Sequence, residues 1–172
     1  MDKNSRNKRR IVVIPREEAV FWMDENGDWW NEHGRFEKRR IIEYFHASIR
    51  HDFCGFYVEQ ENGDILERVY FPYIDTALFV IRIIDGENPK AVLNTGIKID
   101  LDPAALFMEN DNLYIRVNGV KAKFIKQGLE EVLKLIDPEK MAIKINGRQY
   151  PMGIEKNKGF VDFLKDFFKK IW

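Results

Sequence analysis

Four Asn-Gly dipeptides constrain the fold of this chain more than any other feature of its sequence. They occupy residues 26–27, 62–63, 118–119 and 146–147. A two-residue hairpin loop needs positive φ at both central positions, and Asn and Gly reach such angles at little steric cost. Asn-Gly between apolar runs is therefore a strong hairpin signal, and the sequence predicts four β-hairpins.

Each pair of hairpins encloses a segment with helical periodicity. In residues 37–50 the apolar side chains fall on one helical face, formed by Ile41, Ile42, Phe45 and Ile49. A second helix is predicted at about residues 125–136, and it ends at Asp137 because Pro138 disfavours helical backbone in the residue before it. Both halves of the chain thus read as strand, strand, helix, strand, strand.

This repeated order predicts an α+β fold of two related units, with duplicated hairpin, helix, hairpin segments at about residues 19–71 and 113–152. Residues 77–84 and 91–101 are each predicted to form one further strand. The sheet should be mostly antiparallel, because the sequence lacks the long crossover helices that parallel strands require.

Changes in composition divide the chain into four predicted parts. The first ten residues carry five basic side chains and one acidic one, which is typical of a disordered tail. An arm that binds nucleic acid is the functional alternative for this tail. The predicted parts are a disordered basic tail at 1–10, an N-terminal α+β unit at 11–73, a C-terminal α+β unit at 74–153 and a C-terminal amphipathic helix at 154–172.

The predicted terminal helix has one strongly aromatic face, formed by Phe160, Phe163, Leu164, Phe167, Phe168 and Ile171. We expect this face to pack on the sheet of its own domain, since terminal helices commonly cover open sheets. A peripheral membrane anchor is the alternative, because the lysines of the opposite face and Trp172 suit a lipid headgroup interface.

Charge and cysteine content bear on the partners and the compartment of the protein. Lys+Arg and Asp+Glu number 28 each, so no overall field attracts nucleic acid or an anionic membrane, and neither is an expected partner. The single cysteine, Cys54, cannot form an intramolecular disulfide. No apolar signal segment and no bilayer-length apolar run occurs. These features predict a cytoplasmic protein and leave its oligomeric state open.

Patterns for catalysis or metal binding are weak in this sequence, which has no metalloprotease, nucleotide-binding or serine-hydrolase motif. His46 and His51 are five residues apart and so point in different directions on a helix. Cys54 is predicted to be a small buried group. The first hairpin carries three carboxylates that turn geometry explains better than a calcium loop, namely Asp24, Glu25 and Asp28. We expect no metal, no cofactor and no enzymatic activity.

Aromatic residues are denser than one small core usually requires, both around the first hairpin and near the boundary between the units. Pockets for apolar ligands are often lined by aromatic side chains and favour domain junctions. Core packing is the alternative explanation for these rings. The predicted ligand-lining residues are Trp30, Phe36, Tyr73 and Phe79.

Blocks of turn and core residues follow one another along the chain, at Asp24 to Trp30, His33 to Phe36, Arg40 to Ile42 with Phe45, Leu66 to Val69, Asp75 to Val80, Tyr114 to Ala122 and Gly147 to Gly153. In this order they resemble the bacterial domain of unknown function 1285 family, from about Ala19 to Gly153. The resemblance implies a duplicated α+β core whose second half is pleckstrin-homology-like. It also implies an apolar-ligand site between the halves, a role in signalling and no enzymatic activity. The chain departs from the family by lacking a longer segment before the first strand and by adding the terminal helix.

Three functional hypotheses follow from these observations. The first is a non-catalytic, cytoplasmic binding module that holds a small apolar ligand or an apolar peptide at the junction of its two units. The second is peripheral membrane or protein-partner docking through the helix at 154–172. The third is a small hydrolase that uses His46, His51 or Cys54. A hollow, aromatic-lined junction would favour the first of the three.

Overall fold

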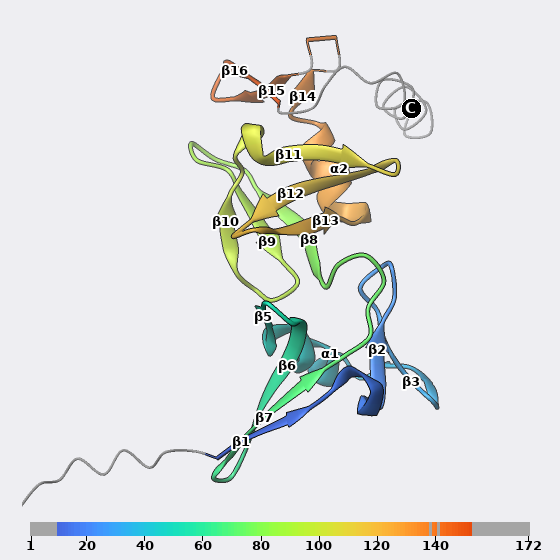
Figure 1. The fold of residues 1–172 in the computed structure, drawn as a ribbon. Helices are drawn as coiled ribbons and strands as arrows, with labels where there is room; N and C mark the ends of the chain where they lie inside the picture. Colours follow the sequence, from blue (N-terminus) through green and yellow to red (C-terminus); the bar gives the residue numbers. More distant parts are fainter. Residues whose placement is uncertain (1–9, 138, 141, 153–172) are drawn as a thin grey trace, which may run out of the picture. The chain divides into compact units, whose positions relative to one another are not determined.

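The computed structural model describes residues 10–137, 139–140 and 142–152, and in this part of the chain it is mostly β-sheet with two α-helices (Figure 1). The predicted α+β class is confirmed. The chain divides into two compact units, one up to Ala77 and one from Leu78. The predicted terminal helix lies outside the described residues, as does the predicted basic tail apart from Arg10, which belongs to the first strand.

The larger sheet of the first unit has four strands in the order β1-β7-β6-β5. Its strands are β1 (Arg10–Ile14), β5 (Ile49–Asp52), β6 (Gly55–Asn62) and β7 (Ile65–Tyr70). β1 and β7 are parallel, and the other neighbours are antiparallel. A smaller antiparallel sheet contains β2 (Phe21–Met23), β3 (Trp29–Asn31) and β4 (Gly34–Arg35). The connections are a short 3-10 helix, η1 (Arg16–Glu18), between β1 and β2, and the helix α1 (Arg39–Ala47) between β4 and β5.

Aromatic rings fill the core of the first unit. The ring of Trp29 on β3 is almost fully buried, and its centroid lies 4.8 Å from that of Phe71 and 5.3 Å from that of Phe45 on α1. Phe21 on β2 packs edge-on against Phe45 at 4.9 Å. Such edge-to-face contacts contribute about 0.5–1.5 kcal/mol each beyond the burial of apolar area. Ring contacts therefore join the small sheet to α1.

The larger sheet of the second unit has six strands in the order β10-β9-β8-β13-β12-β11. Its strands are β8 (Leu78–Ile84), β9 (Lys90–Leu93), β10 (Lys98–Asp100), β11 (Leu106–Glu109), β12 (Asn112–Val117) and β13 (Val120–Phe124). β8 and β13 are parallel, and the other neighbours are antiparallel. The remaining elements are η2 (Pro103–Ala105), α2 (Lys126–Leu133) and a small antiparallel sheet of β14 (Ile136–Asp137), β15 (Ala142–Ile145) and β16 (Arg148–Pro151).

Helix α2 packs closely against the central strand β8. β13 pairs with β8 only as far as Val80, where β8 has an irregularity between Val80 and Arg82. The Glu131 carboxylate on α2 then accepts a hydrogen bond from the Ile83 N–H at 2.5 Å, so a side chain supplies the acceptor. Gly128 permits this approach, because a Cβ at this position would lie 2.4 Å from the Val80 carbonyl oxygen.

All four Asn-Gly sites lie at hairpins, as predicted, and two of them have the predicted loop geometry. At residues 118–119 and 146–147 the flanking residues pair directly, so each dipeptide is a two-residue loop. The φ angles are 49° and 86° in the first of these loops and 50° and 76° in the second. Positive φ at both positions is what a type I′ turn requires.

The hairpin at Asn62-Gly63 is shifted by one residue from its predicted register. Asn62 pairs with Ile65, so the loop is Gly63-Asp64 and Asn62 is the last residue of β6. Gly63 has a φ of 58°, whereas Asp64 is not among the residues with positive φ. This is the arrangement of a type II′ turn, in which Gly occupies the first central position.

The first hairpin has a longer loop, residues 24–28, which a single side chain organises. One carboxylate oxygen of Asp24 accepts the backbone N–H of Asn26 at 2.9 Å and that of Asp28 at 3.0 Å. The other accepts the indole N–H of Trp30 at 2.8 Å. Asp24 is thus engaged by three donors within its own hairpin, in agreement with turn geometry rather than a calcium loop.

Both helices are shorter than predicted. Helix α1 covers Arg39–Ala47 rather than residues 37–50, and Ile49 begins β5. Helix α2 ends at Leu133, and Ile136 begins β14. Buried residues of the following strand continue the apolar spacing of each helix, so periodicity alone places the helix ends too late.

The predicted strand at residues 91–101 is wrong in one respect, because it consists of the two strands β9 and β10. Between them the Gly96 N–H donates to the Leu93 carbonyl at 2.8 Å, and Gly96 has a φ of 83°. The dipeptide that precedes this glycine, Asn94-Thr95, strengthens a turn signal that the apolar pattern concealed.

Candidate functional site

Two of the predicted ligand-lining residues make contacts within the first unit that packing alone explains. Trp30, half-buried on β3, donates its indole N–H to Asp24. Phe36 packs edge-on against Phe45, with ring centroids 5.3 Å apart. Both contacts stabilise the small sheet and its connection to α1.

The other two predicted ligand-lining residues lie in different units. The ring of Tyr73 lies 5.2 Å from that of Phe56, and the Arg16 guanidinium lies over its face, 5.3 Å from the centroid. Phe79 is on β8 in the second unit and is almost fully buried. The ligand-lining role of the four residues stays a prediction.

The two histidines of the hydrolase hypothesis lie in separate surroundings. His46 on α1 donates from Nε2 to the Gly27 carbonyl at 3.1 Å, and burial lowers the pKa of its imidazole. The His51 ring on β5 packs against Phe56, with centroids 4.7 Å apart. Among the described residues, no group of three His, Cys, Asp or Glu side chains is placed to hold a metal ion.

Cys54 is exposed, and the prediction that it is buried was wrong. Asp52 on β5 pairs with Gly55 on β6, which leaves Phe53 and Cys54 as the loop of a tight hairpin. The Cys54 N–H donates to Oδ1 of Asp52 at 2.9 Å. The side chain is therefore held at a loop tip and not at the passage from a helix into a buried strand.

A cluster of charged and aromatic side chains lies on the larger sheet of the first unit. The Tyr70 hydroxyl donates to Oδ2 of Asp52 at 2.6 Å, which raises the pKa of Tyr70 to about 12 and lowers the pKa of Asp52. Arg68 forms an ion pair with Glu59 at 3.0 Å and lies over the ring of Tyr57. The groups of this cluster satisfy one another, so it stabilises the sheet and offers no free charge to a ligand.

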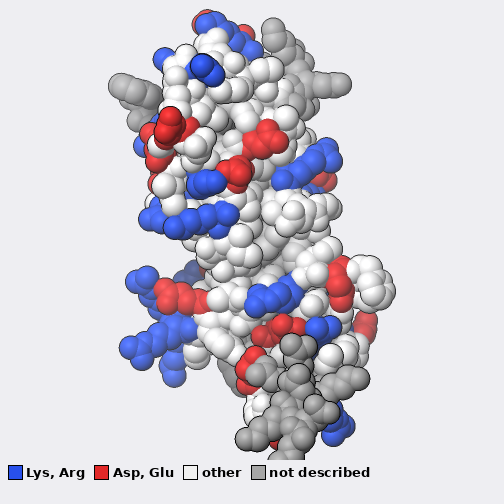
Figure 2. Space-filling model, turned by 90° about the vertical axis from the view of Figure 1, so that its left-hand side faces the viewer, with Lys and Arg blue, Asp and Glu red and all other residues white. Residues whose placement is uncertain are grey.

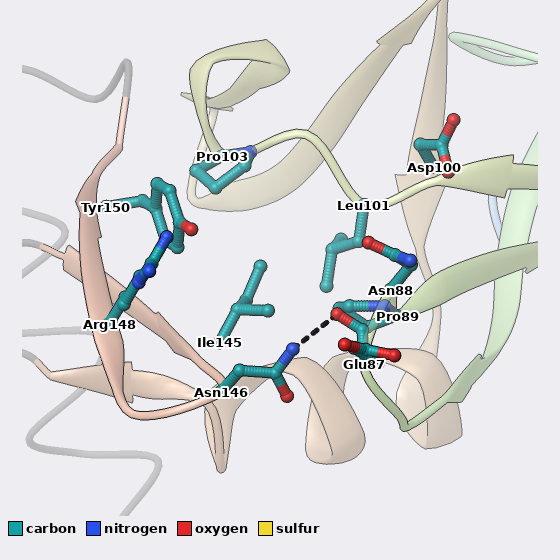
Figure 3. A pocket seen from close by; sticks show the side chains of 10 residues that line it. All are labelled: Glu87, Asn88, Pro89, Asp100, Leu101, Pro103, Ile145, Asn146, Arg148 and Tyr150. Carbon is teal, nitrogen blue, oxygen red and sulfur yellow. Dashed lines mark hydrogen bonds between the residues drawn. The ribbon is translucent and has the colours of Figure 1, made fainter.

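A cavity of about 580 Å³ in the second unit is the candidate binding site (Figure 3). Its walls come from the turn between β8 and β9, the segment from β10 to η2, and the β15–β16 hairpin. The apolar part of the lining consists of Pro89, Leu101, Pro103 and Ile145. The polar part consists of Glu87, Asn88, Asp100, Asn146, Arg148 and Tyr150. The volume lies in the range of small-molecule sites, and the lining is more polar than is usual for them.

Two hydrogen bonds fix the walls of this cavity relative to one another. The Asn146 side chain, at the tip of the β15–β16 hairpin, donates from Nδ2 to the Glu87 carbonyl at 2.6 Å. The Leu101 N–H donates to the Pro89 carbonyl at 3.1 Å, which holds the end of β10 against the turn before β9. Segments far apart in the sequence thus converge on one hollow (Figure 3).

One face of the small sheet supplies the third wall. Arg148 and Tyr150 are two residues apart on β16 and so share a face of the strand. Directly opposite them on β15 lie Ile145 and Ile143, of which Ile143 is fully buried. Lys144 points to the other face and is exposed. The cavity is therefore lined by isoleucine on the inner strand and by arginine and tyrosine on the outer one.

Sequence reasoning singled out no residue of this cavity as a binding residue. Arg148 and Tyr150 lie within the block Gly147 to Gly153 on which the family resemblance partly rests. The available signal was the alternation of a charged and an aromatic side chain on a strand after an Asn-Gly turn. The convergence of three distant segments has no local signature.

The surface of the described residues carries both signs of charge. Figure 2 shows Lys and Arg interspersed with Asp and Glu over the face in view. Within the described part of the chain, no helix combines the length and the apolar character needed to cross a bilayer.

Comparisons with known proteins identify the fold. No family model matches the sequence, and no curated protein matches it. The crystal structure of a DUF1285 family protein from Silicibacter pomeroyi DSS-3 superposes with a TM-score of 0.58 at 11% identity and covers 83% of each chain. The chain has a DUF1285-like fold. A second DUF1285 family structure, from Shewanella baltica OS155, gives a TM-score of 0.47 at 13% identity, over 62% of this chain and 84% of that one. The resemblance read from the sequence is thus confirmed as a resemblance of fold.

Proposed function

We propose that this DUF1285-like protein is a non-catalytic binding module whose ligand occupies the cavity of the second unit. The observation that carries the proposal is the joining of an apolar floor, formed by Leu101, Pro103 and Ile145, with polar side chains at its rim. Pockets of several hundred Å³ bury small ligands by apolar contact and orient them through polar groups.

The composition of the lining supports binding rather than catalysis. Its ten residues include no His, Cys, Ser, Thr or Lys, which are the usual nucleophiles and proton-transfer groups. Of its two carboxylates, Asp100 forms an ion pair with Lys90. With Glu87 as a general base, the described lining offers only Asp100, which is paired with Lys90, and Tyr150 as further titrating groups.

A matched pair of tryptophan variants tests this proposal. Ile145→Trp fills the cavity from its floor, whereas Lys144→Trp places the same ring on the opposite, exposed face of β15. A library of small fragments is screened against the full chain by saturation-transfer NMR. We expect the binding fragments to lose affinity about tenfold or more in Ile145→Trp and to keep it in Lys144→Trp. Fragments that bind both variants equally, or a library without a binder, would contradict the proposal.

The more detailed hypotheses read from the sequence stay predictions beside this one. They are an apolar-ligand site at Trp30, Phe36, Tyr73 and Phe79, a duplicated core, a pleckstrin-homology-like second half and a role in signalling. A saturable quenching of tryptophan fluorescence by a fatty-acid probe, lost in Phe36→Ala and kept in Ile145→Trp, would favour the aromatic site over the cavity. Docking through the helix predicted at 154–172 concerns residues outside the described part of the chain.

A further inference from the structure

Two opposite charges reach the cavity from opposite sides. Glu87 stands on the turn between β8 and β9, and Arg148 stands on β16 (Figure 3). Neither side chain has an ion-pair partner among the described residues. Asp100, the third charged residue of the lining, pairs with Lys90. The charges that the cavity offers to a ligand are therefore one carboxylate and one guanidinium.

The surface between these two charges is partly apolar, with the side chains of Ile145 and Asn146 between them, and the Asn146 amide is already bonded to the Glu87 carbonyl. Figure 3 shows the Ile145 side chain rising between the β16 side and the β8–β9 side, with Pro103 and Leu101 beyond it. A ligand that reached both charges would lay an apolar segment across this floor. Tyr150 and Asn88 add a hydroxyl and an amide at the two sides, which can bond to polar groups between the ends of a ligand.

We propose that the cavity binds short peptides with free ends, holding the terminal ammonium group at Glu87, the terminal carboxylate at Arg148 and an apolar side chain on the floor at Ile145. The proposal rests on the ligand site proposed above and names the class of its ligand. Arginine suits this role because its guanidinium forms paired hydrogen bonds with a carboxylate. Specificity would come from the distance between the two charges, since each end group must meet its own partner.

Other ligand classes fit this arrangement less well. A fatty acid would place its carboxylate at Arg148 and leave Glu87 without a partner at the other end. A single amino acid carries both charges on one carbon atom, whereas Glu87 and Arg148 lie on opposite sides of the cavity. A short peptide separates its two charges by amide groups and side chains. It also matches a volume of about 580 Å³, which lies in the range of drug-sized ligands.

Calorimetric titration of the full chain with the tripeptide Ala-Leu-Ala tests the proposal. Three forms are compared, which are the free peptide, its N-acetylated form and its C-amidated form. In the wild type, each blocking group should weaken binding about tenfold or more, because each removes a hydrogen bond to a charged group. In Glu87→Gln, acetylation should cost nothing further. In Arg148→Gln, amidation should cost nothing further.

Two controls keep a failure of this proposal distinguishable from a failure of the ligand site. Lys144→Gln removes a charge from the face of the small sheet opposite Arg148 and should leave all three affinities unchanged. If blocked and free peptides bind equally, or if no peptide binds while fragments still depend on Ile145, the peptide proposal is wrong and the ligand site stands. If neither peptides nor fragments respond to Ile145→Trp, both proposals fail. Glu87 and Arg148 are exposed, so their variants should fold.

Discussion

The two units use the same order of four strands but fill their cores with different side chains. In the first unit the order is β1-β7-β6-β5, and in the second it is β8-β13-β12-β11 within a wider sheet. In each unit, three strands that follow one another in the sequence are antiparallel neighbours. The last of the three pairs in parallel with the first strand of the unit. The helix differs in position, because α1 precedes the three strands and α2 follows them. One sheet order thus occurs with two different positions of the helix in the sequence.

The contrast in packing follows from what each helix meets. Phe45 on α1 meets Phe21 and Trp29, whereas Gly128 on α2 lets the helix backbone approach β8 directly. The large buried side chains of the second unit are mostly aliphatic, and they include Leu93, Leu106, Leu113, Ile115, Leu133 and Ile143. In the first unit, large aromatic rings fill the space between the helix and the strands. In the second unit, the helix lies close to β8 because Gly128 has no side chain, and Glu131 accepts a hydrogen bond from the β8 backbone. The predictions below test this difference.

Loss of the central ring should produce the largest effect. Trp29→Ala removes a nearly fully buried indole, and we expect the free energy of unfolding to fall by about 3–5 kcal/mol in urea titrations. Trp29→Phe should cost clearly less, because it keeps a ring and removes an indole N–H that has no acceptor among the described residues. Trp22→Ala, at a partly exposed position on β2, is the control. Equal losses at both tryptophans would contradict a core built on rings.

The second unit should be sensitive to a single methyl group. Alanine is favoured over glycine by about 1 kcal/mol within a helix. At Gly128 the added Cβ would meet the Val80 carbonyl oxygen, so we expect Gly128→Ala to destabilise the protein by about 2–3 kcal/mol. Lys126→Ala, on the exposed side of the same helix, should change stability by no more than about 0.5 kcal/mol. A stabilising Gly128→Ala would show that the helix can move away from β8 at no cost.

The acceptor at Glu131 should matter less than the space at Gly128. Glu131→Ala leaves the Ile83 N–H without its carboxylate acceptor, and we expect a loss of about 1–2 kcal/mol. Glu131→Gln keeps an acceptor and should lose less. Hydrogen exchange at the Ile83 amide provides the direct readout, with Glu130→Ala as the control. Unchanged exchange in Glu131→Ala would mean that the Ile83 N–H donates to another acceptor, which would contradict the role of Glu131.

The smallest expected effect concerns the hydrogen bond between Tyr70 and Asp52 in the first unit. This bond raises the pKa of Tyr70 to about 12, above its ordinary value of 10.0. The unfolded chain therefore loses this proton first, so the contribution of Tyr70 to stability is complete below pH 10 and disappears as the pH rises through about 12. An ultraviolet titration should show one late-titrating tyrosine that is absent in Tyr70→Phe. If Tyr70→Phe leaves the late step of the titration unchanged, the hydrogen bond between Tyr70 and Asp52 is contradicted.

The hairpins were predictable because their signals are local. Asn and Gly at residues 118–119 and 146–147 fix both the turn type and the pairing of the flanking strands. The hairpin at Asn110-Asp111 was missed, although both residues have positive φ, because two polar residues without glycine also suit many other loops. The long first loop was missed because the side chain of Asp24, rather than backbone preference, sets its shape.

The parallel pairings and the cavity could not be read from the sequence. β1 pairs with β7 although most of the sequence of the first unit lies between them, and no local pattern specifies so distant a neighbour. The cavity likewise joins Glu87, Leu101 and Arg148, which belong to three different connections. Aromatic density was a visible signal, but in the first unit rings such as Trp29 and Phe45 are engaged in packing one another.

A map of backbone amide chemical shifts tests the central claim most directly, because it compares the two units in one experiment. The full chain is titrated with the tightest-binding fragment, and shifts are recorded for the whole described part of the chain. The account predicts that saturable changes gather at residues 87–88, 101–102 and 145–150 in the second unit. Changes gathered instead around Trp30, Phe36 and Tyr73, with the second unit unaffected, would contradict it.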